Sequence, residues 1–66
     1  MKALVNGESL DLPDGLTVAA LLEFLGSPQR GIAVARNERV VRRSEYDAAR
    51  LAEGDRIEII RAVAGG

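Results

Sequence analysis

Arg56-Ile57-Glu58-Ile59-Ile60-Arg61 is the stretch that decides the fold, because charged and apolar residues alternate in it directly before a tail of small residues. Successive side chains of a strand point to opposite faces of a sheet. We therefore expect a last strand with Ile57 and Ile59 in the core and Ile60 on the opposite face. There Ile60 is either exposed and open to a partner or covered by a second layer, and the sequence leaves both open.

The first elements form a predicted β-hairpin. Residues 1–5 and 8–12 have strand character, and Asn6-Gly7 between them is a dipeptide favoured where a tight turn needs positive φ. After a turn at residues 13–15, Thr17 can cap a short helix. The helix ends at residues 26–28, Gly-Ser-Pro, and its apolar residues recur on one face, which we expect to be core: Val18, Leu21, Leu22 and Leu25.

The middle of the chain predicts a second hairpin. Residues 31–36 form an apolar run typical of a strand covered on both faces, and residues 39–42 form a short strand after the turn Asn37-Glu38. Residues 44–47 resemble a capping motif for one helical turn, and Tyr46 closes one end of the core. Residues 51–55 then form a turn anchored by Leu51.

This order of elements predicts an α+β chain with one main helix packed across a mixed sheet of four or five strands. It fits a β-grasp, ubiquitin-like fold, in which the last strand commonly lies parallel to the first. With 66 residues the chain makes one domain. We expect residues 1–61 to form the β-grasp domain and residues 62–66 a flexible C-terminal tail.

Composition excludes several classes of function. Nine basic and ten acidic residues give a net charge of −1, so a nucleic-acid partner is not expected. No apolar run could span a bilayer and no signal peptide is visible, so we expect a cytoplasmic protein without a membrane partner. The chain has no Cys and no His, which removes thiol chemistry, the commonest metal ligand and the usual general base. We expect no enzyme, no metal site and no bound cofactor.

Two groups of charged residues could form a site. The region Arg36–Arg56 contains a possible basic patch of Arg39, Arg42, Arg43 and Arg50, but interspersed acidic residues favour ordinary surface charge over partner contact. The pairs Asp11 with Asp14 and Glu53 with Asp55 flank turns and have no nucleophile beside them, so we interpret them as turn formers rather than acid–base pairs.

The tail Ala62-Val63-Ala64-Gly65-Gly66 suits chemistry at the chain's end. Five extended residues reach on the order of 15 Å, enough to enter a slot on another protein. Two glycines let the chain pass through a narrow slot. A carboxylate must be activated before it reacts, and because this chain lacks a P-loop, the partner would have to bind ATP. The alternative is that the glycines merely tolerate a frayed end.

The whole chain resembles the sulfur carriers of thiamine biosynthesis, the ThiS family. This sequence differs from the family pattern at Val5, where members often carry an aromatic residue. The residues that carry it are Asn6-Gly7, Leu21-Leu22, Ala33-Val34-Ala35 with Asn37, Leu51–Asp55, Ile57-Glu58-Ile59 and Arg61-Ala62-Val63-Ala64-Gly65-Gly66.

The resemblance implies that a ThiF-type partner adenylates Gly66, that a cysteine desulfurase system supplies sulfur, and that the resulting thiocarboxylate serves thiazole synthase. ATP would be used by the partner. The predicted partner-binding residues are Ile60, Arg61, Ala62, Val63, Ala64 and Gly65. Alternatives that share the terminus are a sulfur carrier for molybdopterin or tRNA thiolation and a ubiquitin-like modifier. A non-covalent β-grasp binding module is the alternative from another class.

Overall fold

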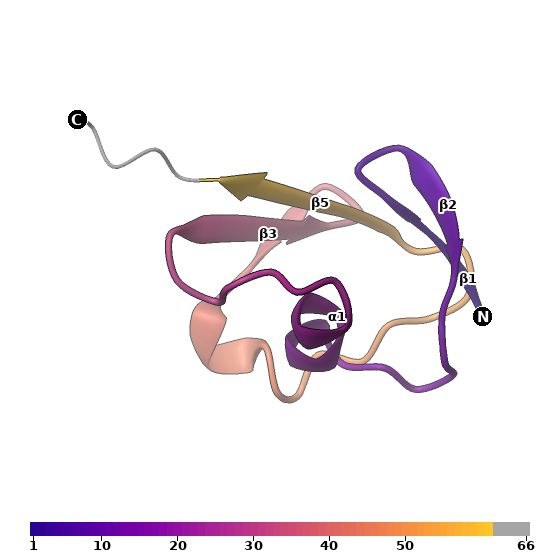
Figure 1. Ribbon diagram of the computed structural model, residues 1–66, viewed down its shortest axis with the longest axis horizontal. Helices are drawn as coiled ribbons and strands as arrows, with labels where there is room; N and C mark the ends of the chain where they lie inside the picture. Colours follow the sequence, from indigo (N-terminus) through magenta and orange to yellow (C-terminus); the bar gives the residue numbers. More distant parts are fainter. Residues whose placement is uncertain (62–66) are drawn as a thin grey trace.

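A computed structural model of the chain describes residues 1–61, and Figure 1 shows its arrangement. Five strands form one sheet, and the helix α1 packs against it. The strands and helices are β1 (Lys2–Val5), β2 (Glu8–Asp11), α1 (Val18–Phe24), β3 (Ile32–Arg36), β4 (Arg39–Val41), the 3-10 helix η1 (Arg43–Glu45) and β5 (Arg56–Arg61). The predicted α+β order is confirmed.

The sheet is mixed, with strand order β2-β1-β5-β3-β4. The two hairpins β1–β2 and β3–β4 are antiparallel, and β5 joins them, parallel to β1 and antiparallel to β3. The last strand thus lies in the middle of the sheet, beside the first, as expected for a β-grasp fold.

Both hairpins turn through residues with positive φ. Asn6 and Gly7 have φ of 52° and 81°, and they join Val5 to its partner Glu8. In the second hairpin, Asn37 and Glu38 have φ of 51° and 71°. Asn tolerates this left-handed region, whereas Glu rarely adopts it. The second turn therefore carries local strain at Glu38.

The helix α1 supplies three of the most deeply buried side chains. The Thr17 hydroxyl accepts the Ala20 N–H at 3.1 Å, as the predicted cap requires. Val18, Leu21 and Leu22 are fully buried. The expectation that Leu25 joins them is wrong, because α1 ends at Phe24 and Leu25 is 38% exposed where the chain turns away. At seven residues, α1 is far shorter than a bilayer requires, and no other helix of residues 1–61 is long and apolar enough to cross one.

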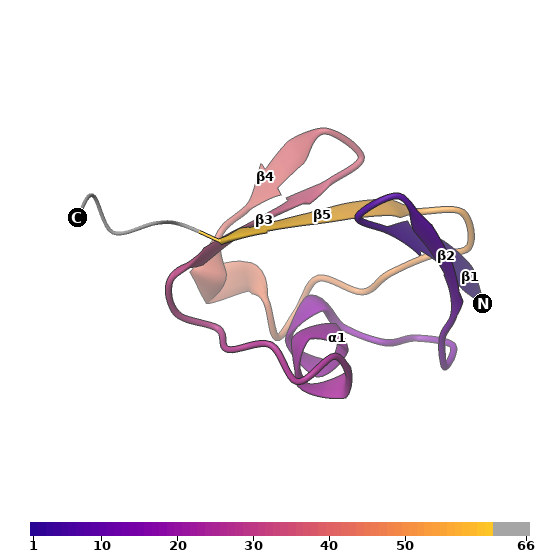
Figure 2. The same cartoon turned by 45° about the horizontal axis from the view of Figure 1, so that its top comes forward.

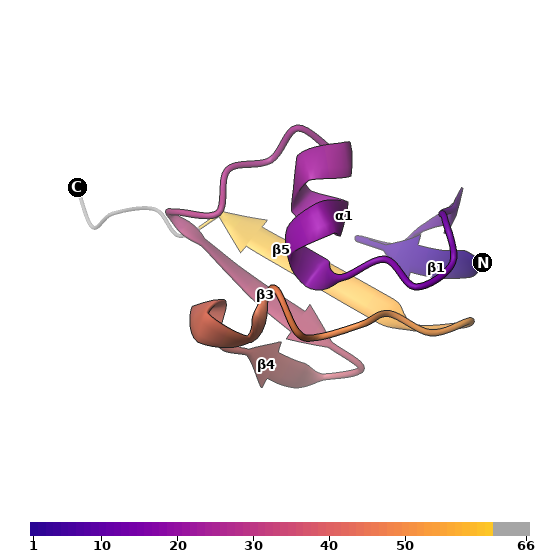
Figure 3. The ribbon, with the colours of Figure 1, turned by 90° about the horizontal axis from the view of Figure 1, so that it is seen from below.

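The core lies between α1 and one face of the sheet, as Figures 2 and 3 show from two sides. Tyr46 and Leu51 are buried in it, as expected. The single helical turn is present but begins at Arg43, one residue before the predicted start. Its cap is the Glu45 carboxylate, which accepts the Arg42 N–H at 3.1 Å, rather than the hydroxyl of Ser44. The buried set is Ala3, Val5, Leu12, Val18, Leu21, Leu22, Val34, Tyr46, Leu51 and Ile57.

The opposite face of the sheet is open. The prediction that residues 31–36 are covered on both faces is wrong, because Ala33 is exposed while its neighbour Val34 is buried under α1. Alanine side chains made the run look uniformly apolar although only one of its faces meets the core. The sheet therefore has a buried face, toward α1, and an outer face.

Candidate functional site

The strand β5 leads into the predicted reactive tail. Of the predicted site residues, Ile60 and Arg61 end β5. The others lie outside the described residues: Ala62, Val63, Ala64, Gly65 and Gly66. Within residues 1–61, the site consists of β5 and the groups that hold it.

Asparagines from the two hairpin turns hold β5 from both sides. On the β1 side, Asn6 donates its N–H to the Ile57 carbonyl at 2.8 Å, and its side-chain oxygen accepts the Ile59 N–H at 2.8 Å. On the β3 side, the Asn37 side-chain oxygen accepts the Arg56 N–H at 2.9 Å. The Asn6 amide thus extends the contact beyond the point where β1 itself turns away.

Asp55, just before β5, is the centre of a buried polar cluster. Its side chain is 8% exposed and accepts three contacts: from Arg36 Nε at 2.9 Å, from the Ala52 N–H at 2.8 Å and from Asn37 Nδ2 at 3.0 Å. Burial acts to raise the pKa of Asp55, but the hydrogen bonds from Ala52 and Asn37 and the Arg36 charge outweigh it and hold that pKa below its ordinary value. The cluster fixes the start of β5 to the β3–β4 turn.

The outer face of the sheet carries an apolar patch near the end of β5. Ile60 is 58% exposed and pairs with Ala33 across β3. Val40 is 77% exposed and pairs with Ala35 on the same face. We call Ala33, Ala35, Val40 and Ile60 the outer patch. Of the two alternatives for Ile60, exposure is the one observed.

The arginines considered for a basic patch do not act as one group. Arg36 is bound to Asp55, and Arg56 pairs with Glu38 at 2.9 Å. Arg50 directs Nη1 to the Gly15 carbonyl at 3.4 Å. This leaves Arg39, Arg42 and Arg43 without an ion pair among residues 1–61.

The carboxylate pairs are occupied by groups of the chain itself. Asp14 and Asp11 lie 3.0 and 3.7 Å from the ammonium group of Met1. Glu53 accepts the Lys2 N–H at 2.9 Å, while Asp55 belongs to the cluster described above. Their arrangement is that of turn formers, as interpreted. Within residues 1–61, no group of three or more possible metal ligands is present.

Sequence reasoning missed the roles of Asn6, Asn37 and Asp55 in holding β5. It identified Asn6 only as a turn residue and Asp55 only as part of a turn. A usable signal was available at Asn37, because an Asn between two short strands both turns the chain and offers a side-chain amide. No pattern in the sequence connects Asn37 to Asp55, since 18 positions separate them.

Comparisons with known proteins cover the whole chain. The ThiS family profile matches residues 2–66. The Escherichia coli protein named sulfur carrier protein ThiS is 35% identical over 66 residues, which is all of both chains. The crystal structure of the thiamine biosynthesis protein ThiS from Geobacter metallireducens superposes with a TM-score of 0.88 at 30% identity, again over all of both chains.

A second kind of relative is longer. A thiazole synthase from Paramagnetospirillum magneticum is 39% identical over all 66 residues, and one from Magnetococcus marinus is 41% identical. The chain spans about a fifth of their length, 20% in each case. A ThiS-like segment therefore occurs within proteins of that name.

The profile match includes the tail, and the β-grasp fold of the described residues is that of the solved relative. On these grounds the chain belongs to the ThiS family.

Proposed function

We propose that this chain is the sulfur carrier of thiamine biosynthesis and that the carboxylate of Gly66 is its reactive group. The single observation that carries the proposal is the match to the ThiS family through the last residue of the tail. The full-length likeness to the Escherichia coli sulfur carrier supports it, and so does a chain without Cys or His for catalysis of its own.

The proposed chemistry takes place in partner enzymes. A Gly66 carboxylate oxygen attacks the α-phosphorus of ATP in a ThiF-type adenylating enzyme, and diphosphate leaves. A persulfide supplied through a cysteine desulfurase system then displaces AMP to form an acyl disulfide, and a thiol reductant cleaves the S–S bond, leaving the thiocarboxylate and a disulfide. When the sulfur has been passed to the thiazole precursor, hydrolysis restores the carboxylate. The chain itself binds no cofactor, and it works in the cytoplasm, where ATP is available.

The proposed docking surface combines the end of β5 with the outer patch. Ile60 and Arg61 lead directly into the tail, so a partner that takes up Ala62 to Gly66 must also approach the end of β5. The exposed Ile60 and Val40 offer apolar area for that approach. Thiazole synthase is the proposed acceptor of the sulfur, because proteins of that name contain a segment similar to the whole chain.

Intact-mass spectrometry tests the proposal. We expect the purified chain, incubated with ATP, a ThiF-type enzyme and a sulfur donor, to gain the mass that replaces one terminal oxygen by sulfur. A chain shortened by Gly66 should show no gain while keeping its urea unfolding midpoint, because ten residues of the described part of the chain already form a continuous buried core. A shortened chain that still acquired sulfur, or a complete chain that never did, would contradict the proposal.

A further inference from the structure

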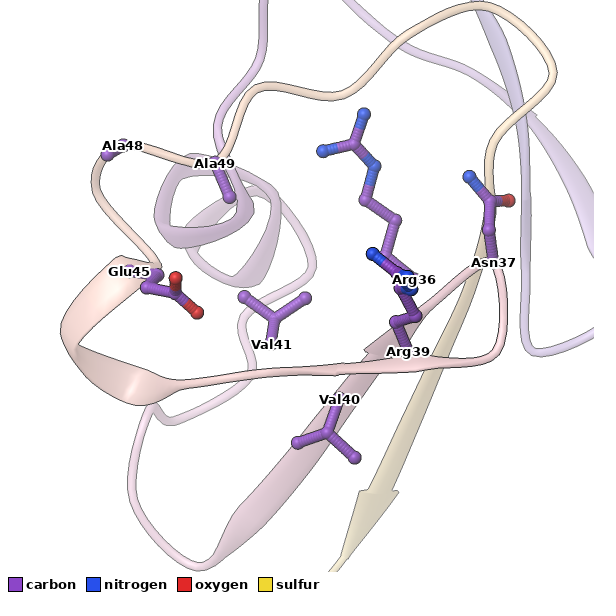
Figure 4. A pocket seen from close by; sticks show the side chains of 8 residues that line it. All are labelled: Arg36, Asn37, Arg39, Val40, Val41, Glu45, Ala48 and Ala49. Atoms are coloured by element: carbon purple, nitrogen blue, oxygen red, sulfur yellow. The ribbon is translucent and has the colours of Figure 1, made fainter.

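A groove lies beside the β3–β4 hairpin, and Val40 of the outer patch contributes to its lining. It has a volume of about 500 Å³ and runs between the hairpin and the loop that follows η1. Figure 4 shows Arg36 and Arg39 at one end, Glu45 at the other, and Val41 between them. Ala48 and Ala49 line the side opposite the hairpin. The groove thus has a cationic end, an apolar middle and an acidic end.

The cationic end holds two like charges in an unfavourable position. Arg36 and Arg39 are direct partners across the antiparallel β3–β4 pair, where like charges destabilise a sheet. Arg36 is held by Asp55 through Nε, which leaves its remaining donors available. Arg39 is exposed and forms no ion pair within the described part of the chain. Asp55 already offsets the charge of Arg36, so an anion bound at this end would chiefly supply the counter-charge that Arg39 lacks within residues 1–61.

The acidic end fixes the direction in which a ligand can lie. Glu45 Oε1 accepts the Arg42 N–H at 3.1 Å, so the carboxylate is anchored there and would repel a second anion. The aliphatic side chains of Val41, Ala48 and Ala49 fill the space between. A matching ligand therefore carries its negative charge at the hairpin end and an apolar group beside it.

We infer that this groove docks a segment of a partner protein in which a carboxylate side chain lies next to an aliphatic one. The carboxylate pairs with Arg36 and Arg39, and the aliphatic group covers Val41, Ala48 and Ala49. Charge complementarity selects an acidic segment, and the combination of a charged end with an apolar middle selects a peptide over a bare anion. This goes beyond the proposed function, because the acidic segment is recognised by Arg36 and Arg39, which lie outside the outer patch, and its docking needs no chemistry at Gly66.

Titration of the ¹⁵N-labelled chain with a capped Val-Glu-Val peptide, followed by NMR, tests the inference. We expect saturable shifts at the backbone amides of Arg36, Arg39, Val41, Ala48 and Ala49. The capped Val-Gln-Val peptide should bind about fivefold or more weakly, since it lacks the charge. The Arg39→Glu variant should lose binding to a similar extent, and Arg39→Gln to a smaller one, whereas Arg42→Glu should bind as the original chain does, because Arg42 does not line the groove.

Equal binding of both peptides, shifts centred elsewhere, or binding unchanged in both Arg39 variants would overturn the inference. Inorganic phosphate that shifts the same amides at lower concentrations than the peptide would also overturn it, in favour of a small-anion site. The spectrum of each variant in the absence of peptide reports whether it is folded. A chain lacking Gly66 should bind the peptide normally, so failure of the sulfur-carrier proposal would leave this result untouched.

Discussion

Asp55 connects two regions that are distant in sequence: it binds Arg36 and Asn37, where β3 passes into the β3–β4 turn, and it binds Ala52 in its own loop before β5. Because this carboxylate is buried and fully paired, removing its charge would leave buried donors without an acceptor. The start of β5 depends on a single ionised side chain.

This ionisation predicts a pH dependence. The folded-state pKa of Asp55 lies below its ordinary value of 3.8, so the charge stabilises the fold above about pH 5 and that stabilisation is lost as pH falls through the lowered pKa. We expect Asp55→Asn to cost about 1–3 kcal/mol in the free energy of unfolding at neutral pH, with the difference shrinking below about pH 4. Urea unfolding of the two proteins over a pH series measures the loss of stability and its dependence on pH. A difference that stayed constant down to acid pH would rule out this role.

Glu38 is strained, and removing the strain should stabilise the fold. Its φ of 71° costs a non-glycine residue about 1 kcal/mol, whereas its exposed ion pair with Arg56 contributes about 0–1 kcal/mol. We expect Glu38→Gly to raise the free energy of unfolding by up to about 1 kcal/mol. Glu38→Gln, which removes only the charge, should lower it slightly. Thermal unfolding of the two variants side by side distinguishes strain from charge, and a less stable glycine variant would refute the strain argument.

At the scale of elements, alternation and turn chemistry identified all five strands and α1 from the sequence. Asn6-Gly7 predicted the first hairpin correctly because the dipeptide itself adopts the turn. The prediction was wrong at Leu25 and for the covering of residues 31–36. In both cases periodicity identifies apolar residues but not where a helix stops or whether a second layer exists. For the candidate site, alternation placed Ile60 on the face opposite Ile57 but left open whether it is exposed, and the contacts of Asn37 and Asp55 depend on tertiary structure.

The contact between the first hairpin and β5 can be tested through the hydrogen bond from the Ile59 N–H to the Asn6 side chain. Asn6→Ala removes the acceptor of the Ile59 N–H, so we expect a loss of about 1–2 kcal/mol in the free energy of unfolding and faster hydrogen exchange at the Ile59 amide. Asn6→Asp keeps an acceptor oxygen and should preserve most of the protection. If Ile59 exchanged equally in all three proteins, Asn6 would act only as a turn residue.

At the scale of the whole molecule, one face of the sheet is buried and the other is exposed. One face forms the core with α1, and the other exposes the outer patch beside the end of β5. A single core of this size supplies only about 3–5 kcal/mol, so exposed apolar residues that do not contribute to it point to contact with another molecule.

A substitution in the outer patch should slow the proposed adenylation without destabilising the fold. Ile60→Asp should slow adenylation of Gly66 by about tenfold or more, because it places a charge where an apolar partner surface would dock, while the unfolding midpoint changes little. Phe24→Asp is the matched control, since Phe24 is 59% exposed but lies on α1, away from the outer patch. Equal slowing in both variants, or in neither, would argue against docking through the patch.

The central place of β5 has a mechanical consequence. An edge strand that is pulled by its end can open one hydrogen bond after another, but β5 has a neighbour on each side and side-chain amides at both turns. The pairing with β3 continues to Arg61, whereas the contacts on the β1 side end with the bond from the Ile59 N–H to Asn6. A load applied along the strand through its C-terminal end is therefore borne first by the bonds to β3, and the bonds on the β1 side add resistance only deeper in the sheet.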